Sequence, residues 1–294
     1  MGHYSIKELE KLSGIKAHTI RIWEKRHQLI NPKRTQTNIR YYSDEDLKKI
    51  IQVSVLNNHG LKISHIVGLS LDDLNRKVSE LSEATESIEI YIDQLILAMV
   101  DLEEEGFEQI LGHLTVKFGF EKTVVEILYP FLEKIGILWL NNNITPAQEH
   151  FISNLIRQKL IVAIDGLPLP PKTAPRAVLF LPENESHELG LLFYYYLVKK
   201  LGFRPYYLGQ NVPYKDLQSV YEQHQPQVLI SSFTTNPSQK VLPGYVARMS
   251  AEFATSRIYL SGVALKKADM GSLPNVQIFE NALKIKELLK NYFV

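Results

Sequence analysis

The stretch AVLFLPENESHELGLLFYYYLVKKLG, residues 177–202, joins a short apolar run to a longer apolar segment through a polar one. The run AVLFL has the length and composition of a strand buried on both faces, and a helical pattern begins near His187. The polar segment ENESHELG at 183–190 therefore lies where a strand passes into a helix. Glu185, His187 and Gly190 stand in it at the spacing E-x-H-x-x-G.

Strands and helices continue to alternate from residue 176 to the end of the chain. Further strands are expected at RPYYLG, QVLISS, RIYLSG and VQIF, with helices from Val212, around 241–253 and over 281–293. Near-continuous apolar strands separated by helices predict a doubly wound, Rossmann-like α/β domain of about five parallel strands over 176–294. In such sheets ligands bind beyond the carboxyl ends of the strands. The segments there are ESHELG, SSFT with Ser232 and Thr234, and SG at Ser261 and Gly262.

A linker and a helical region precede this domain. GLPLPPKTAP at 166–175 has four prolines in ten residues and no apolar period, which is typical of a linker. Residues 71–165 show helical periodicity with breaks at glycines and at NNNITP, and they predict a four-helix bundle. Thr145 is expected to cap its last helix, with Pro146 in the first position.

The first 70 residues are basic. They contain 12 Lys and Arg against 6 Asp and Glu, which leaves 21 against 26 for the remainder. This asymmetry favours a polyanion-binding head on an otherwise ordinary body.

The absence of cysteine excludes disulfides, thiolate zinc sites and a cysteine nucleophile. With a charged N-terminus and no apolar run of about 18 residues, we expect a cytoplasmic chain that does not enter a membrane.

The head has the pattern of a winged helix-turn-helix. Ser5 and Glu8 predict a capped first helix that ends at Gly14. The second helix, AHTIRIWEKRHQL, would bury Ile20 and Trp23 and turn polar and basic side chains outward. Two short extended pieces around Pro32 then predict a wing, and SDEDL begins a third helix.

The segments YSIKELEKLSGIKAHTIRIWEKR, LINPKRT and N-x-RYYS resemble the winged-helix head of the MerR family of transcription regulators. The resemblance implies an all-α winged head over 1–70 that binds double-stranded operator DNA as a dimer. Thr19 and Arg21 would approach the major groove, Arg34 and Arg40 would hold phosphates, and Tyr41 or Tyr42 would pack or touch the backbone. The alternative is a solvated basic face. The candidate DNA-binding residues are His18, Thr19, Arg21, Lys25, Arg34, Arg40, Tyr41 and Tyr42.

The three segments beyond the strands resemble the cobalamin-binding module of methionine synthase and cobalamin-dependent mutases, with its D-x-H-x-x-G, S-x-L or S-x-T, and G-G pattern. The resemblance implies that His187 ligates the cobalt and that Glu185 hydrogen-bonds its other ring nitrogen. Gly190, Ser232, Thr234 and Gly262 would lie along the nucleotide tail of the cofactor. This chain departs from the pattern with Glu185 in place of aspartate, Thr234 in the second motif, and Ser261 in place of the first glycine.

Head, bundle and sheet together resemble the light-responsive, adenosylcobalamin-dependent MerR regulators of the CarH and LitR group. By this resemblance Trp139 would cover the adenosyl group, and Glu149 and His150 would line its pocket. Without it, Trp139 is a core aromatic residue and the Glu-His pair is a helix-start carboxylate beside a solvated imidazole. Leu140 stands where well-known members have a histidine that can bind cobalt after photolysis, although His150 could substitute.

These features predict a DNA-binding regulator, a repressor by resemblance, that binds adenosylcobalamin and forms a dimer or tetramer whose stability depends on light. One alternative is a MerR-type regulator whose sheet has lost its ligand and serves oligomerisation or a partner protein. An enzyme is not expected, because no barrel or separate substrate domain accompanies the module.

Overall fold

The computed structural model describes residues 3–85, 87–140, 144–268 and 270–293. The chain divides into two compact units, Met1–Ile152 and Ser153–Val294, and the division falls within one long helix. No helix in the described parts is long and apolar enough to cross a bilayer.

The first unit begins with the winged helix-turn-helix that the sequence predicts. The Glu8 carboxylate accepts the Ser5 amide at 2.5 Å, and Gly14 ends the first helix with a φ of 70°. In the wing, Lys33 lies opposite Tyr41 and Arg34 opposite Arg40 in an antiparallel pair. The elements of the head are α1 (Ile6–Ser13), α2 (Ala17–His27), β1 (Lys33–Arg34), β2 (Arg40–Tyr41), α3 (Asp44–Asn58) and α4 (Ile63–Ile66).

Two buried tyrosines hold the start of the chain to the wing. Tyr4 and Tyr42 pair through both of their backbone amides, and both side chains are fully buried. The Tyr4 hydroxyl donates to Asp44 at 2.9 Å and the Tyr42 hydroxyl to Glu24 at 3.2 Å. Burial, with Glu24 nearby, raises the pKa of Tyr42 to about 12. The wing is thereby fixed to the body of the head.

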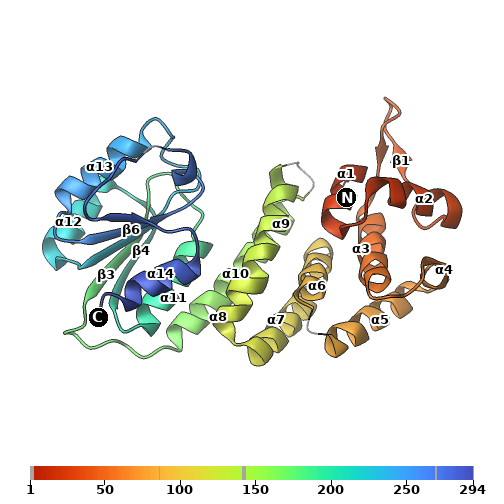
Figure 1. Ribbon diagram of the computed structural model, residues 1–294, viewed down its shortest axis with the longest axis horizontal. Helices are drawn as coiled ribbons and strands as arrows, with labels where there is room; N and C mark the ends of the chain where they lie inside the picture. The colour runs from red at the N-terminus through yellow and green to blue at the C-terminus, as the bar shows by residue number, and fades with distance from the viewer. Residues whose placement is uncertain (1–2, 86, 141–143, 269, 294) are drawn as a thin grey trace. The chain divides into compact units, whose positions relative to one another are not determined.

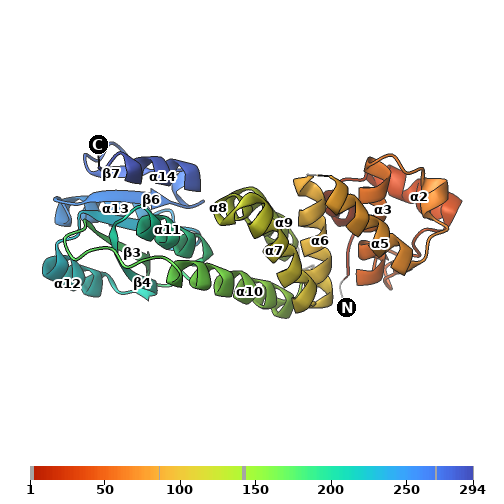
Figure 2. The same cartoon turned by 90° about the horizontal axis from the view of Figure 1, so that it is seen from below.

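The rest of the first unit is helical, and the described residues of 71–165 contain no strand, as predicted. Figure 2 shows α6, α7 and α9 side by side. Gln148 near the start of α10 donates to the Val100 carbonyl of α6 at 3.2 Å, and Thr145 caps α10. By contrast, α5 packs on α3 of the head. The elements are α5 (Leu71–Ala84), α6 (Ile88–Asp101), α7 (Glu104–Phe118), α8 (Phe120–Lys122), the π-helix η1 (Thr123–Leu128), α9 (Tyr129–Leu140) and α10 (Pro146–Asp165).

A π-helical turn interrupts what the sequence presents as one helix over KTVVEILYPFLEKIGILWL. The Tyr129 amide bonds to the Val124 carbonyl, five residues back, and Pro130 follows without an amide hydrogen. Because proline cannot donate to the ladder and its ring crowds the preceding turn, the helix widens just before it.

The second unit is a doubly wound domain with a five-stranded parallel sheet in the order β4-β3-β5-β6-β7, as predicted. Figure 1 shows α12 and α13 on one face of the sheet and α11 and α14 on the other. The elements are β3 (Arg176–Pro182), α11 (Leu189–Lys200), β4 (Arg204–Val212), α12 (Tyr214–His224), β5 (Val228–Ser232), α13 (Leu242–Glu252), β6 (Arg257–Ser261), the 3-10 turn η2 (Leu265–Lys267), β7 (Val276–Ile278) and α14 (Ala282–Lys290).

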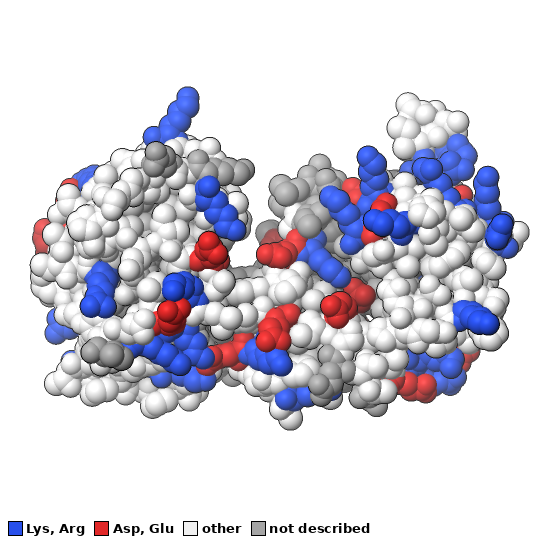
Figure 3. All heavy atoms as spheres, viewed as in Figure 1, with Lys and Arg blue, Asp and Glu red and all other residues white. Residues whose placement is uncertain are grey.

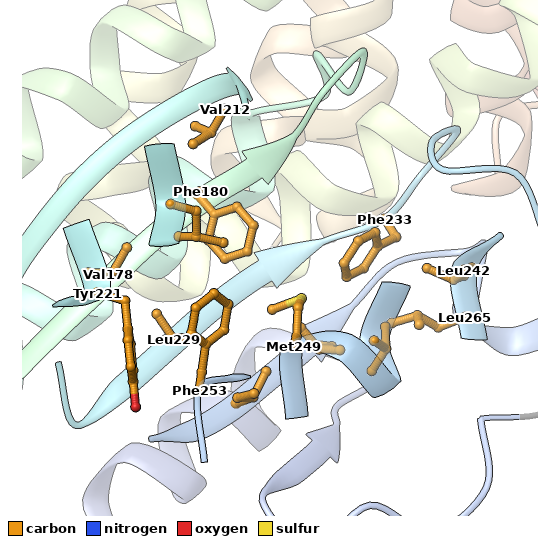
Figure 4. Packing of buried hydrophobic residues seen from close by; sticks show 14 of the residues in the cluster. Val178, Phe180, Val212, Tyr221, Leu229, Phe233, Leu242, Met249, Phe253 and Leu265 are labelled. Carbon is orange, nitrogen blue, oxygen red and sulfur yellow. The ribbon is translucent and has the colours of Figure 1, made fainter. Parts of the chain in front are cut away.

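The core beneath α12 and α13 fixes the ends of the central strands. Phe180 of β3 and Phe233 after β5 are fully buried there against Met249 and Phe253 (Figure 4). The strand order reverses between β3 and β5, which makes their junction the switch point of the sheet. The loops after these two strands therefore open onto the position where doubly wound sheets bind ligands.

Candidate functional site

The Glu185 carboxylate joins the two loops at the switch point. Its side chain is fully buried. Its Oε2 accepts the backbone amides of Thr234, Thr235 and Asn236 at 2.9, 2.6 and 3.1 Å, and the Thr235 hydroxyl at 3.2 Å. Three successive amides aimed at one oxygen form an anion-binding nest. The loop after β5 is thus shaped around a carboxylate supplied by the loop after β3.

The other oxygen of the same carboxylate orients His187. Glu185 Oε1 lies 2.5 Å from His187 Nδ1 and also accepts the His187 amide at 3.2 Å. Burial alone would raise the pKa of Glu185, but the bonds from His187 and from the amides of Thr235 and Asn236 outweigh it and hold that pKa well below its usual range. A charged carboxylate only accepts, so Nδ1 carries a proton, and a neutral ring in this tautomer has its lone pair on Nε2.

This donor set fits a metal that brings most of its own ligands. The His187 side chain is 54% exposed while its carboxylate partner is buried, which is the arrangement of a metal-binding histidine with an orienting acid. Among the described residues, no group of three or more His, Cys, Asp or Glu could hold a bare ion. A Cβ at Gly190, three residues after the histidine, would meet no atom within 4 Å, so packing within the protein does not require a glycine there. A cobalt held in a corrin ring needs only one such protein ligand.

The predicted tail-binding residues lie at the ends of β5 and β6. The Thr234 amide is used by Glu185, and Ser232 is half-buried. The Ser261 hydroxyl donates to the hydroxyl of the buried Tyr194 at 3.4 Å. Gly262 has a φ of 116°, and a Cβ there would lie 2.1 Å from the Phe233 carbonyl oxygen. The packing of the loops after β5 and β6 therefore requires a glycine at position 262. The contacts of these residues with the nucleotide tail remain predictions.

Sequence reasoning missed the ion pair that fixes the residue after His187. Glu188 is buried, with its Oε1 2.8 Å from Arg157 Nε of α10 and its Oε2 accepting the Tyr207 hydroxyl at 3.0 Å. The Lys199 ammonium donates to the Ile164 carbonyl at 2.7 Å, near the end of the same helix. These contacts hold residues 153–165 of α10 to the sheet domain. In the sequence, Glu188 is only an acidic residue at the start of a predicted helix, and nothing there indicates its partner Arg157.

The bundle residues expected above the corrin are partly described. Glu149 Oε2 lies 2.7 Å from His150 Nδ1 in the first turn of α10, and the His150 side chain is 71% exposed. Trp139 and Leu140 belong to α9, but their side chains lie outside the described residues. The pocket roles of Trp139, Glu149 and His150 therefore remain predictions.

The candidate DNA-binding residues fall on α2 and the wing. Figure 3 shows Lys and Arg side chains around both elements. The Arg34 guanidinium donates to Asn38 Oδ1 at 2.7 Å, and Arg40 Nε lies 3.5 Å from Glu24. Tyr41 stacks on His3 at 4.3 Å, whereas Tyr42 is fully buried and therefore packs, one of the two roles expected for these tyrosines. The exposed members are His18, Arg21, Lys25, Arg34 and Arg40, and Thr19 and Tyr41 are half-buried.

Comparison with known families matches two stretches of the chain, both of which precede the sheet domain. Residues 4–71 match the MerR HTH family of regulatory proteins, and residues 91–163 match a B12 binding domain. The chain combines a MerR-type DNA-binding head with a B12-binding domain. The B12-binding match runs from within α6 to near the end of α10.

Two regulators from Myxococcus xanthus are similar over most of their length. The HTH-type transcriptional repressor CarH is 29% identical over 222 residues, which cover 73% of each chain. The HTH-type transcriptional repressor CarA is 28% identical over 230 residues, covering 78% of this chain and 75% of CarA. A monomethylamine corrinoid protein from Methanosarcina barkeri has the same fold over 70% of this chain and 100% of its own, with a TM-score of 0.58 and 16% identity.

Proposed function

We propose that the chain is a transcriptional repressor whose operator binding is controlled by adenosylcobalamin held through His187. The observation that carries the proposal is the buried carboxylate of Glu185, 2.5 Å from His187 Nδ1 at the switch point of the sheet. The same chain contains a DNA-binding head and a B12-binding domain. The similarity to two repressors supports repression as the direction of control.

His187 would hold the cobalt through Nε2, because Glu185 fixes the proton on Nδ1. A Cβ at Gly190 would meet no atom of the protein within 4 Å, so this position is open. Bound adenosylcobalamin supplies a cobalt–carbon bond that visible light breaks. Trp139, Glu149 and His150 would surround the adenosyl group, and Ser232, Thr234, Ser261 and Gly262 would contact the tail.

Control of DNA binding would come from assembly of a homo-oligomer, a dimer or tetramer. Heads joined in one assembly bind paired half-sites with a high effective concentration that single heads lack. A cofactor that favours the assembled state by a few kcal/mol is sufficient to shift the population. The dark, loaded form would therefore occupy the operator, and light would release it.

The test is to load the purified chain with adenosylcobalamin in the dark, remove free ligand, and record the visible spectrum and the mass by light scattering before and after green light. We expect retained colour and a fall in mass on illumination. His187→Ala should lose or alter the colour, while His224→Ala, at the last residue of α12, should not. Colour without a change in mass would remove the assembly mechanism and keep cobalamin binding.

A second candidate is a regulator whose sheet no longer takes the cofactor. The contact between Ser261 and the buried Tyr194 favours it, because side chains occupy the end of β6 where the motif usually has a glycine. A wild-type protein that stays colourless after loading would support this second function.

A further inference from the structure

Helix α2 exposes an isoleucine that the core does not use. Ile20 is fully buried and Trp23 is 6% exposed, so these two residues attach the helix to the head. Ile22 is 45% exposed on the other side. A single exposed apolar residue is ordinary on a protein surface. Ile22 differs from an ordinary exposed apolar residue in the side chains that surround it.

The positions one helical turn from Ile22 are all polar. They are His18 and Thr19 before it and Lys25 and Arg26 after it, which are its neighbours at i±3 and i±4. His18, Lys25 and Arg26 are exposed and make no hydrogen bond or ion pair with any described residue. Ile22 is therefore the apolar centre of a polar face, and three of the four side chains around it are donors with no partner among the described residues.

We propose that Ile22 reads thymine in the operator by packing on its 5-methyl group in the major groove. The inference rests on the proposed function, in which this face of α2 binds DNA. The donors around Ile22 suit phosphates and base acceptors, and the methyl group of thymine is the apolar feature of the major-groove edge. A β-branched side chain in a helix has one strongly preferred rotamer, so the contact is formed with little loss of entropy.

The wing offers a matched residue for comparison. Ile39 is 64% exposed on the hairpin between β1 and β2, where Thr35 accepts the Ile39 amide at 3.1 Å. It is as apolar as Ile22 and more exposed, but it does not lie on α2. An effect of general surface hydrophobicity would appear at both positions, whereas thymine reading by α2 would appear at Ile22 alone.

The test uses the full-length protein, loaded with adenosylcobalamin and kept in the dark, and an operator that this loaded protein selects from a random pool of DNA duplexes. Each thymine in the selected site is replaced in turn by deoxyuridine, which removes only the methyl group. We expect wild-type binding to fall by about fourfold at one thymine in each half-site, as for one buried methyl group. Ile22→Ala should bind more weakly and show no further loss at that thymine. Ile39→Ala should keep the wild-type loss.

Two results would overturn the inference while leaving operator binding intact. They are a wild-type protein insensitive to every deoxyuridine, and an Ile22→Ala variant with the wild-type pattern of losses. If the wild type enriches no sequence at all, the proposed DNA-recognition function fails and the Ile22 contact fails with it. Because Ile22 is exposed, its variant should melt at the wild-type temperature, which separates a binding effect from unfolding.

Discussion

Glu185→Gln is the substitution that separates the two tasks of the buried carboxylate. Glutamine has the same shape but offers one acceptor oxygen and one donor nitrogen. If its oxygen faces the amides of 234–236, its nitrogen faces His187 Nδ1, which must then accept. The ring proton moves to Nε2, the nitrogen that would bind cobalt. In the opposite orientation the donor nitrogen opposes three amide donors, and the loop after β5 loses its anchor.

The magnitude follows from these contacts. Loss of an orienting partner typically lowers metal affinity by about 10- to 100-fold, or roughly 1.4 to 2.8 kcal/mol. Each hydrogen bond to a charged acceptor contributes about 1.5 to 3 kcal/mol, so the opposite orientation costs at least as much through the loop. We therefore expect Glu185→Gln to weaken cobalamin binding by at least about tenfold.

Equilibrium dialysis of adenosylcobalamin in the dark measures this loss directly. Glu183→Gln is the matched control, because Glu183 is exposed two residues away and carries the same charge change. It should keep the wild-type Kd. A Glu185→Gln protein with an unchanged Kd would refute the reasoning that this carboxylate sets the state of His187.

Three further outcomes follow from the structure. The pKa of Glu185 is depressed from its usual 4.5, so its contribution to stability is complete above that value and is lost as pH falls toward the native pKa. Urea midpoints of the wild type should therefore fall more steeply below about pH 5 than those of Glu185→Gln. Gly262→Ala should destabilise the sheet domain by about 3 kcal/mol or more in urea, since its Cβ would meet the Phe233 carbonyl. Arg157→Leu leaves Glu188 buried without its cation, and amide hydrogen exchange over 153–165 should rise by about tenfold or more.

The parts of the fold that the sequence predicts are those set by neighbours in the chain. The Ser5 and Glu8 cap, the Thr145 cap and the five strands depend on residues a few positions apart or on continuous apolar runs. The site at His187 is visible for the same reason. Its carboxylate and imidazole are two residues apart, and the start of α11 places them beyond a strand.

The features that the sequence does not predict depend on residues that only the fold brings together. Glu185 binds amides about 50 positions away, and backbone amides carry no sequence signal. Arg157 is one of many basic residues on amphipathic helices, so nothing in the sequence assigns it to Glu188. Gly262 fits a nucleotide-tail motif, yet its close neighbour is the Phe233 backbone, which depends on how β5 and β6 pack.

The most direct test of cobalamin binding through His187 is electron paramagnetic resonance of the protein loaded with the cobalt(II) form of cobalamin. The protein is grown with histidine labelled with the heavy nitrogen isotope. If His187 is the lower ligand, each cobalt line splits into a doublet in the labelled protein and a triplet in the unlabelled one, and His187→Ala loses the isotope effect. A triplet in the labelled wild type would show that the lower ligand comes from the cofactor itself and would contradict the role assigned to His187.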